Sequence, residues 1–153
     1  MKRDEVRNRY DNQHFLFGLF FSFGNRLQAA GDAFYDEITS KQFFLSICLG
    51  IFGKEAPTLG ELADVFGSSH QNVKQIINKM EKSGYVVTFT DPEDKRKVRV
   101  KGTDKLKQLG EKYNEKGTWF LEQLYEGIDE KDLEVTCKTM AAIEKNLIKL
   151  KMN

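Results

Sequence analysis

The sequence contains few of the residues that build metal, redox or disulfide sites. Its 153 residues include two cysteines, Cys48 and Cys137, and two histidines, His14 and His70, and each pair is far apart in the chain. A disulfide framework needs several cysteines, and a structural zinc site needs closely spaced pairs of ligands. We therefore expect neither a bound metal ion nor a cofactor.

Long hydrophobic runs and catalytic motifs are also missing. No stretch approaches the roughly 20 apolar residues that span a bilayer. The charged start, Met1 to Glu5, is unlike a secretory signal. The sequence shows no nucleophile–base motif, phosphate-binding loop or carboxylate dyad. Length and composition, with 40% hydrophobic and 31% charged residues, predict a single globular domain. The missing motifs argue against an enzyme, and the absence of a signal or spanning segment predicts a location in the cytoplasm.

The net charge is only +1, but the charges are unevenly distributed. Residues 68–102 carry 8 basic and 4 acidic side chains, whereas residues 1–67 carry 7 and 9, and residues 103–153 carry 9 and 10. A localised positive field attracts anions more strongly than the net charge suggests. This distribution favours a nucleic-acid partner for the central segment.

Residues 58–67 predict a short helix followed by a tight turn. Thr58 and Glu61 have the spacing of a capping box, which satisfies two N–H groups at a helix start. Apolar residues at helical spacing follow as far as Phe66. Gly67 suits the left-handed conformation at which many helices end.

Residues 69–82 predict a second helix, capped by Ser68 or Ser69. One face is apolar at a spacing of three and four residues and consists of Val73, Ile76, Ile77 and Met80. The opposite face carries amide and basic side chains, which can hydrogen-bond to base edges in the DNA major groove. An ordinary helical hairpin with a solvated polar face is the alternative at this point.

Residues 85–100 predict a β-hairpin. Residues 85–90 are β-branched and aromatic, as in a strand, and residues 98–100 form the return strand. The turn between them ends in Lys95, Arg96 and Lys97. A hairpin beside a helix in the major groove can place an arginine in the adjacent minor groove, with other cations on phosphates. The helix-turn-helix with this wing favours a DNA-binding protein.

Residues 58–103 resemble the MarR family of winged-helix transcription regulators, and the order and length of the expected helices extend the resemblance to nearly the whole chain. The matching residues are Val73, Ile77, Met80, Glu81, Gly84, Tyr85, Asp91, Asp94, Arg96, Val98 and Thr103. The family's wing has roughly the pattern D-x-R-D-x-R, followed by apolar residues and L-T-x-x-G. This chain departs from it at Glu93, where the family often has Arg, at Gly102, where it has Leu, and at Leu106, where it has Gly.

The resemblance implies that Arg96 enters the minor groove and that Asp94 orients it. Together with the polar face of residues 69–82, it yields a set of expected DNA contacts: Ser69, His70, Gln71, Asn72, Lys74, Gln75, Asn78, Asp94, Lys95, Arg96 and Lys97. Among these, Gln71, Lys74 and Gln75 are the expected base contacts.

The remaining segments predict further helices. Phenylalanines nearly encircle a helix from Asn12 to about Ala30, which Gly31 is expected to end before a connector at residues 33–38. Because a helix apolar on most sides must be covered on most sides, we expect a partner chain. A helix at residues 41–52, capped by Thr39 or Ser40, is expected to bury the face formed by Phe43, Phe44, Ile47, Cys48, Ile51 and Phe52. Two long helices, to about Tyr125 and about Lys151, follow the wing.

The expected fold class is therefore mainly α with a small β-hairpin wing: a winged helix-turn-helix with about six helices. By resemblance, residues 1–153 form one MarR-like domain. Its dimerisation helices lie at about 8–31 and 104–151, and its DNA-binding lobe at about 40–103.

The resemblance also implies a signal that controls DNA binding. Aromatic residues that could line a pocket for a small aromatic effector are Phe15, Phe20, Phe23, Tyr35, Phe43, Phe44, Phe52 and Trp119. The same residues also suit core and dimer packing. Thiol sensing is the other mechanism, but no cysteine lies near the start of the first helix, and Cys48 lies on an apolar face, where a thiol is usually inert.

We predict a homodimeric regulator, with a repressor as the expected form, that binds pseudo-palindromic duplex DNA and is released by a small aromatic ligand. One alternative is a winged helix used for protein interaction. Another, suggested by Glu93 in the wing, is a ligand sensor that does not bind DNA.

Overall fold

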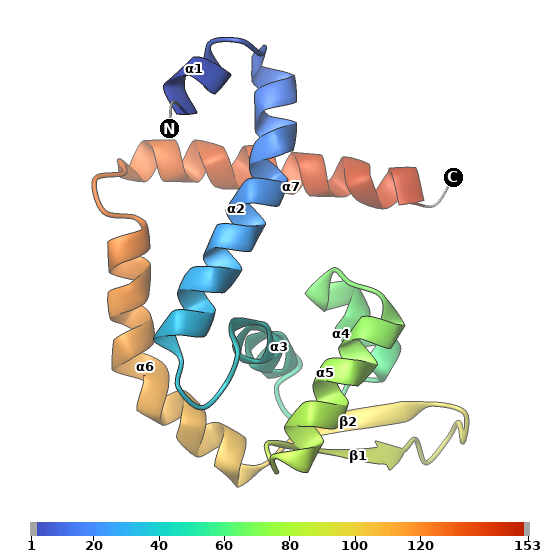
Figure 1. Cartoon of the computed structure of the whole chain (residues 1–153). Helices are drawn as coiled ribbons and strands as arrows, with labels where there is room; N and C mark the ends of the chain where they lie inside the picture. Colours follow the sequence, from blue (N-terminus) through green and yellow to red (C-terminus); the bar gives the residue numbers. More distant parts are fainter. Residues whose placement is uncertain (1–2, 152–153) are drawn as a thin grey trace. The chain divides into compact units, whose positions relative to one another are not determined.

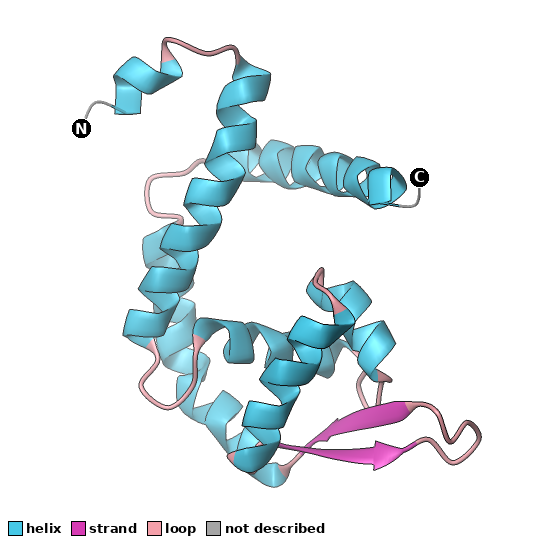
Figure 2. Cartoon of the chain, turned by 45° about the vertical axis from the view of Figure 1, so that its right-hand side comes forward, coloured by secondary structure: helices cyan, strands magenta, loops and turns pink. Residues whose placement is uncertain are grey.

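The computed structural model describes residues 3–151, which are mainly helical with one β-hairpin (Figures 1 and 2). The elements are α1 (Arg3–Arg7), α2 (Asn12–Phe34), α3 (Ser40–Ile51), α4 (Leu59–Phe66), α5 (His70–Lys82), β1 (Val86–Thr90), β2 (Val98–Gly102), α6 (Asp104–Leu124) and α7 (Glu130–Lys151). The predicted fold class is confirmed, with the five-residue α1 in addition to the six expected helices. The chain divides after Gln108 into two compact units.

The core of the first unit lies among α3, α4, α5 and the hairpin. Leu62, Val73, Met80 and Val100 are fully buried there. The four apolar residues predicted for α5 are all buried, which confirms the predicted orientation of this helix. The strands pair antiparallel, with Val86 opposite Gly102 and Thr90 opposite Val98. The polar face of α5 is therefore turned away from the core.

The ends of the two central helices are those that the sequence predicts. Thr58 and Glu61 form the capping box at the start of α4, and Gly67 ends this helix with a φ of 73°. Ser69 caps α5 by accepting a hydrogen bond from the Asn72 N–H at 3.2 Å. The turn between the helices is thus held by local side-chain and backbone preferences.

The helix predicted from Asn12 to about Ala30 ends later than expected. The prediction that Gly31 ends it was wrong, because α2 continues through Gly31 to Phe34. Gly31 is buried, and a Cβ atom at this position would lie 2.6 Å from the Cβ of Ser40. The Ser40 N–H and hydroxyl both donate to Asp32, each at 2.7 Å. Gly31 therefore allows α2 and the start of α3 to approach each other closely, and it does not break the helix.

The expected buried face of α3 was also partly wrong. Phe44, Ile47 and Ile51 are 47–69% exposed, whereas Leu45, Cys48 and Leu49 are buried. The helix is apolar on both sides, so its sequence could not show which side faces the core of the first unit. Thr39 does cap α3, in a capping box with Gln42.

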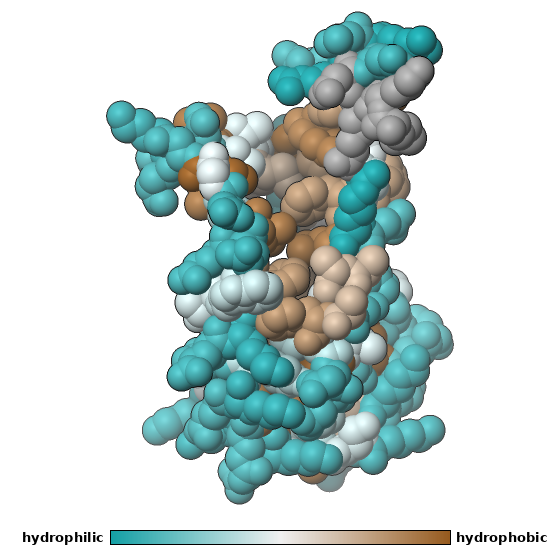
Figure 3. Space-filling view, turned by 60° about the vertical axis from the view of Figure 1, so that its left-hand side comes forward, coloured by the Kyte–Doolittle hydropathy of each residue, from teal (hydrophilic) through white to brown (hydrophobic). Residues whose placement is uncertain are grey.

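The second unit contains the rest of α6 and all of α7. Leu109 and Tyr113 are buried, but no side chain in residues 130–150 is buried. Large apolar side chains lie exposed on α6 and α7, among them Trp119, Leu121, Val135, Leu147, Ile148 and Leu150. Apolar side chains are also visible as brown surface in Figure 3. Within residues 3–151, no helix combines the length and apolar character needed to cross a membrane.

Candidate nucleic-acid interface

The solvent-facing side of α5 carries the amide and basic residues expected to contact DNA. Gln71, Lys74, Gln75 and Asn78 are all exposed, on the side opposite the buried apolar stripe. Their side chains are long enough to reach base edges if the helix lies in a major groove.

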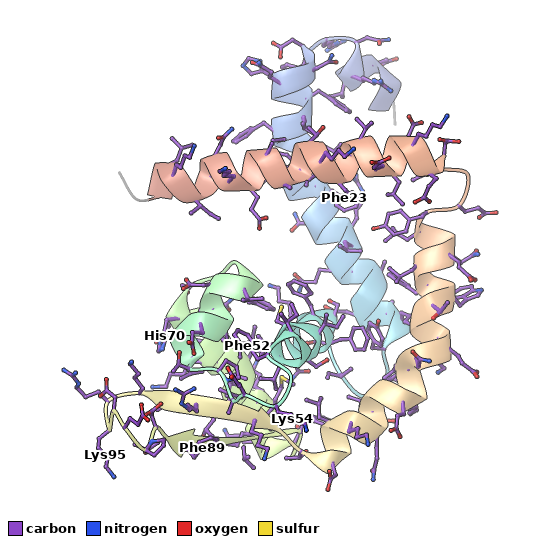
Figure 4. The ribbon with its side chains drawn as sticks, turned by 180° about the vertical axis from the view of Figure 1, so that it is seen from behind. Phe23, Phe52, Lys54, His70, Phe89 and Lys95 are labelled. Carbon is purple, nitrogen blue, oxygen red and sulfur yellow. The ribbon has the colours of Figure 1, made fainter. Side chains whose placement is uncertain are left out.

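The start of α5 is more internally bonded than the sequence suggests. Asn72 is half-buried, and its amide donates to the Ser68 hydroxyl at 2.8 Å. Ser69 is engaged as the helix cap. His70 is exposed at the first turn, where Figure 4 labels it. Of these expected phosphate contacts, Ser69 and His70 are thus exposed, whereas Asn72 is half-buried.

The turn of the hairpin is built around two carboxylates. Asp91 is 3% exposed and accepts hydrogen bonds from the backbone N–H groups of Glu93 (2.7 Å) and Asp94 (2.8 Å). Asp94 in turn accepts from the backbone N–H of Arg96 at 3.1 Å. These bonds fix the backbone of the turn.

Asp94 also holds the side chain of Arg96, as the sequence resemblance implies. The Arg96 Nε donates to Asp94 at 3.2 Å, while the Arg96 side chain is 91% exposed. Lys97 lies 3.8 Å from the same carboxylate. Lys95 lies at the end of the hairpin and points outward (Figure 4). The wing therefore presents three cations, of which Arg96 is directed by a specific partner.

Asp91 pairs with Arg99, a residue that the sequence pattern did not single out. The Arg99 Nε donates to Asp91, and the Arg99 guanidinium also donates to the backbone carbonyl of Ala56 at 2.6 Å. The turn is thereby tied to β2 and to the segment before α4. A basic residue on β2 was visible in the sequence, but its partner 43 positions earlier was not.

A second tie joins the wing to α5. Glu81 accepts from both the backbone N–H and the hydroxyl of Thr88, each at 2.7 Å. Because Glu81 lies on α5 and Thr88 on β1, the helix and the hairpin are held together directly. This fixes the polar face of α5 relative to the hairpin.

The environment of the turn favours charged carboxylates. Hydrogen bonds from the backbone of Asp94 and the side chain of Arg99 lower the pKa of Asp91 to about 2. The backbone and side chain of Arg96 lower the pKa of Asp94 below its usual value. Both groups stay ionised at neutral pH and keep the cations of the wing in place.

The residues expected to line an aromatic pocket are only partly brought together. Tyr35 stacks on Phe43, with ring centroids 4.4 Å apart, and Phe44 contacts Phe66 at 5.2 Å. Phe23 is 51% exposed and Trp119, in the second unit, is 54% exposed. Phe15, Phe20 and Phe52 are half-buried. Their role in ligand binding stays a prediction.

The first unit also contains a groove of about 260 Å³ that the sequence did not predict. None of the eight aromatic residues expected to bind a ligand lines it. It is lined by Gln28, Asp32, Thr39, Lys41, Gln42, Asn72, Gln75, Ile76 and Lys79. The groove lies between α2, α3 and the side of α5, and we call it the flank groove.

The two cysteines differ in accessibility. Cys48 is 1% exposed, and burial raises the pKa of its thiol above the ordinary value. Cys137 is exposed on α7. The environment of Cys48 is that of an inert core thiol.

Comparisons with known proteins concern the family and the fold of the chain. Residues 48–97 match the model of the MarR family. The sequence finds no match among curated proteins. A solved MarR protein from Peptoclostridium difficile DA00132 superposes with a TM-score of 0.78 at 21% identity, covering 90% of this chain and 89% of that one.

Two further solved structures concern DNA binding. One is a complex of S. aureus MepR with DNA, with a TM-score of 0.76, 16% identity, and coverage of 84% of this chain and 95% of that chain. The other concerns the regulation of DNA binding of Bordetella bronchiseptica BpsR by 6-hydroxynicotinic acid, with a TM-score of 0.74, 18% identity, and coverage of 84% and 98%. Residues 48–97, which include α4, α5 and most of the wing, thus belong to the MarR family, and the chain around them has the fold of solved members of that family.

Proposed function

We propose that the protein is a homodimeric transcription regulator that binds double-stranded DNA with sequence specificity. The observation that carries the proposal is the pair of Glu81–Thr88 hydrogen bonds, which joins α5, with its polar face, directly to the cationic wing. A helix that displays glutamine, asparagine and lysine beside a hairpin that displays Arg96 suits adjacent major and minor grooves. The similarity to the DNA-bound MepR structure supports it.

Each residue of the interface has a proposed role. On α5, Gln71, Lys74, Gln75 and Asn78 contact base edges. At its start, Ser69, His70 and Asn72 contact a phosphate, where the helix dipole favours anions. On the wing, Arg96 enters the minor groove in the orientation set by Asp94, and Lys95 and Lys97 contact phosphates.

The exposed apolar side chains support the homodimer. Phe17 and Phe21 of α2 are 65% and 66% exposed, and their rings contact each other edge to face with centroids 5.4 Å apart. Apolar side chains of α7 are also exposed. Exposed apolar surface on either helix is typical of a protein interface. We propose one MarR-like domain, with dimerisation helices at about 8–31 and 104–151 and a DNA-binding lobe at about 40–103. Two copies would address half-sites about 34 Å apart, one turn of DNA.

The test is a selection of bound genomic fragments, followed by fluorescence anisotropy of the selected duplex across a salt series. We expect tight binding with a steep negative log–log dependence on salt. Gln75→Ala should weaken and relax recognition of the selected sequence, with a loss of about 1–3 kcal/mol in discrimination. Arg96→Ala should weaken binding most where an A·T-rich minor groove flanks the site.

Lys54→Ala is the matched control for the loss of a charged side chain. Lys54 is exposed and follows the C-terminal end of α3, outside α5 and the wing (Figure 4). This substitution should leave the affinity almost unchanged. A selection that enriches no fragment would contradict the regulator and favour a protein-interaction module. Ligand-dependent thermal stabilisation without DNA binding would favour a sensor, in line with Glu93 in the wing.

We further propose that the regulator is a repressor released by a small aromatic effector. The stacked pair of Tyr35 and Phe43 supplies aromatic surface next to the joint between α2 and α3. In the similar protein BpsR, 6-hydroxynicotinic acid, an aromatic acid, regulates DNA binding. A panel of aromatic acids should contain a compound that raises Tm and lowers the affinity for the selected DNA. If every stabilising compound leaves DNA affinity unchanged, the effector role is wrong.

A further inference from the structure

The flank groove has the chemistry of an anion site and not of an aromatic pocket. Of the nine residues that line it, Ile76 is the only apolar one, whereas pockets for aromatic ligands are mostly apolar. Lys41 and Lys79 contribute two positive charges and Asp32 one negative charge, which leaves the groove with a net charge of +1. A single negatively charged group suits this balance.

Asp32 is committed to the protein itself. It accepts the backbone N–H and the hydroxyl of Ser40, both at 2.7 Å. Thr39 and Gln42 are likewise engaged with each other in the capping box of α3. The groups in the groove best suited to bind an incoming anion are therefore the ammonium groups of Lys41 and Lys79, with the amide of Gln75 beside them.

The position of the groove on α5 indicates which anion this is. Glu81, which is tied to the wing, and Lys79, which lines the groove, are two positions apart and thus about 160° apart around the helix. The wing and the flank groove therefore lie on opposite flanks of α5. A helix in the major groove has one sugar–phosphate strand on each flank.

We propose that the flank groove seats a backbone phosphate of the DNA strand opposite the wing, held by Lys41 and Lys79. Each protomer then contacts both walls of the major groove, one through the wing and the other through this groove. Gln75, which lines the groove on the exposed side of α5, would be positioned between the seated phosphate and the base edges. The inference deepens the proposed function and rests on it.

The test uses the full chain and the selected duplex in an anisotropy salt series. One seated phosphate per protomer predicts that Lys41→Gln/Lys79→Gln reduces the log–log salt slope of the dimer by about 2 and weakens binding on the order of tenfold at moderate salt. The order of preference among variant duplexes should stay unchanged, because phosphate contacts do not read sequence. Lys41→Arg/Lys79→Arg should retain the slope, and Lys54→Gln is the matched control.

A second measurement locates the phosphate. Duplexes that carry one neutral methylphosphonate at a time should reveal a position in each half-site at which wild type loses affinity and the double Gln variant does not. The phosphate site is wrong if the double Gln variant keeps the wild-type salt slope, or if a methylphosphonate weakens wild type and variant equally. If sequence-specific binding is intact in either case, the proposed regulator function is not affected. Inorganic phosphate that stabilises wild type but not the variant, with unchanged DNA slopes, would assign the groove to a free anion and overturn the proposal. A selection in which wild type enriches no DNA fragment would overturn both proposals.

Discussion

Asp91 is the residue on which the geometry of the wing depends. Its carboxylate joins the turn backbone, through Glu93 and Asp94, to Arg99 on β2. It is buried, and a buried carboxylate that loses its partners is costly because water cannot replace them. The Arg96–Asp94 pair sits directly on this turn, so the direction of Arg96 depends on a residue that itself need not touch DNA.

We expect Asp91→Asn to lower Tm by several degrees at pH 7 and to weaken DNA binding. The folded-state pKa of Asp91, about 2, lies below the usual 3.8. Its charged form therefore stabilises the fold fully above about pH 4, and this contribution is lost as the pH falls towards 2. The Tm difference between wild type and variant, measured by circular dichroism, should be constant from about pH 7 to 5 and shrink below about pH 4.

Asp64→Asn is the control, since Asp64 is an exposed carboxylate on α4. It should leave the Tm at pH 7 nearly unchanged. If the difference in Tm between wild type and Asp91→Asn is the same at about pH 2.5 as at neutral pH, the charge of Asp91 does not have the proposed role.

Single residues could be predicted from the sequence where their partners are local. The caps at Thr58 and Ser69 and the bond between Asp94 and Arg96 span at most three positions, and each follows from a short pattern or resemblance. The bond from Arg99 to Ala56 spans 43 positions and exists only after α4 and β2 have come together. No local pattern contains that information.

At the scale of elements, β2 and α6 lie close together at Gly102 and Leu106. The family has Leu and Gly where this chain has Gly102 and Leu106. A Cβ atom on Gly102 would lie 3.1 Å from the Leu106 Cδ2 and 3.7 Å from that of Leu49. The side chain of Leu106 therefore occupies the space next to β2 that a leucine on β2 would need.

We expect the two positions to be strongly coupled. Gly102→Leu should destabilise the protein by crowding Leu106, and Leu106→Gly should cost about 2–4 kcal/mol through lost packing and helix propensity. The double exchange, Gly102→Leu/Leu106→Gly, should lower the free energy of unfolding by less than the two single changes added together, with a difference of at least about 1 kcal/mol. Urea unfolding of the four proteins measures this coupling, and simple additivity would refute the exchange.

Element boundaries followed the sequence except where packing outweighed local preference. The glycine at position 31 predicts a helix end on its own, yet α2 continues through it. Its missing side chain is used for the close approach to Ser40, a contact that the sequence does not show. The buried face of α3 was ambiguous for a related reason: both sides of the helix are apolar, and only the tertiary structure shows which one lies in the core of the first unit.

At the scale of the whole molecule, the exposed apolar surface of α2 and the localised positive charge connect the proposed dimerisation to the proposed DNA binding. One copy has one α5 and one wing, so under the proposed function the affinity for a pseudo-palindromic site depends on two copies held at a fixed spacing. The Phe-rich composition of α2 already predicted a partner chain, and the exposure of Phe17 and Phe21 agrees with it. Changing the hydrophobic surface of α2 should therefore alter DNA binding without touching the DNA-binding lobe.

We expect Phe21→Asp to shift the protein from dimer to monomer. Loss of a central aromatic anchor costs about 2 kcal/mol or more, which raises the dimer Kd at least about thirtyfold, and charge repulsion between the two new carboxylates adds to this. Sedimentation equilibrium measures the dissociation constant.

Phe89→Asp, at a 41% exposed phenylalanine of the wing, is the matched control and should leave the dimer intact. If Phe21→Asp remains a dimer at the same concentration as wild type, the interface lies elsewhere than on this face of α2. If it becomes a monomer that still binds the selected duplex with undiminished affinity, the two half-sites are not bound cooperatively, and the homodimer has no role in DNA binding.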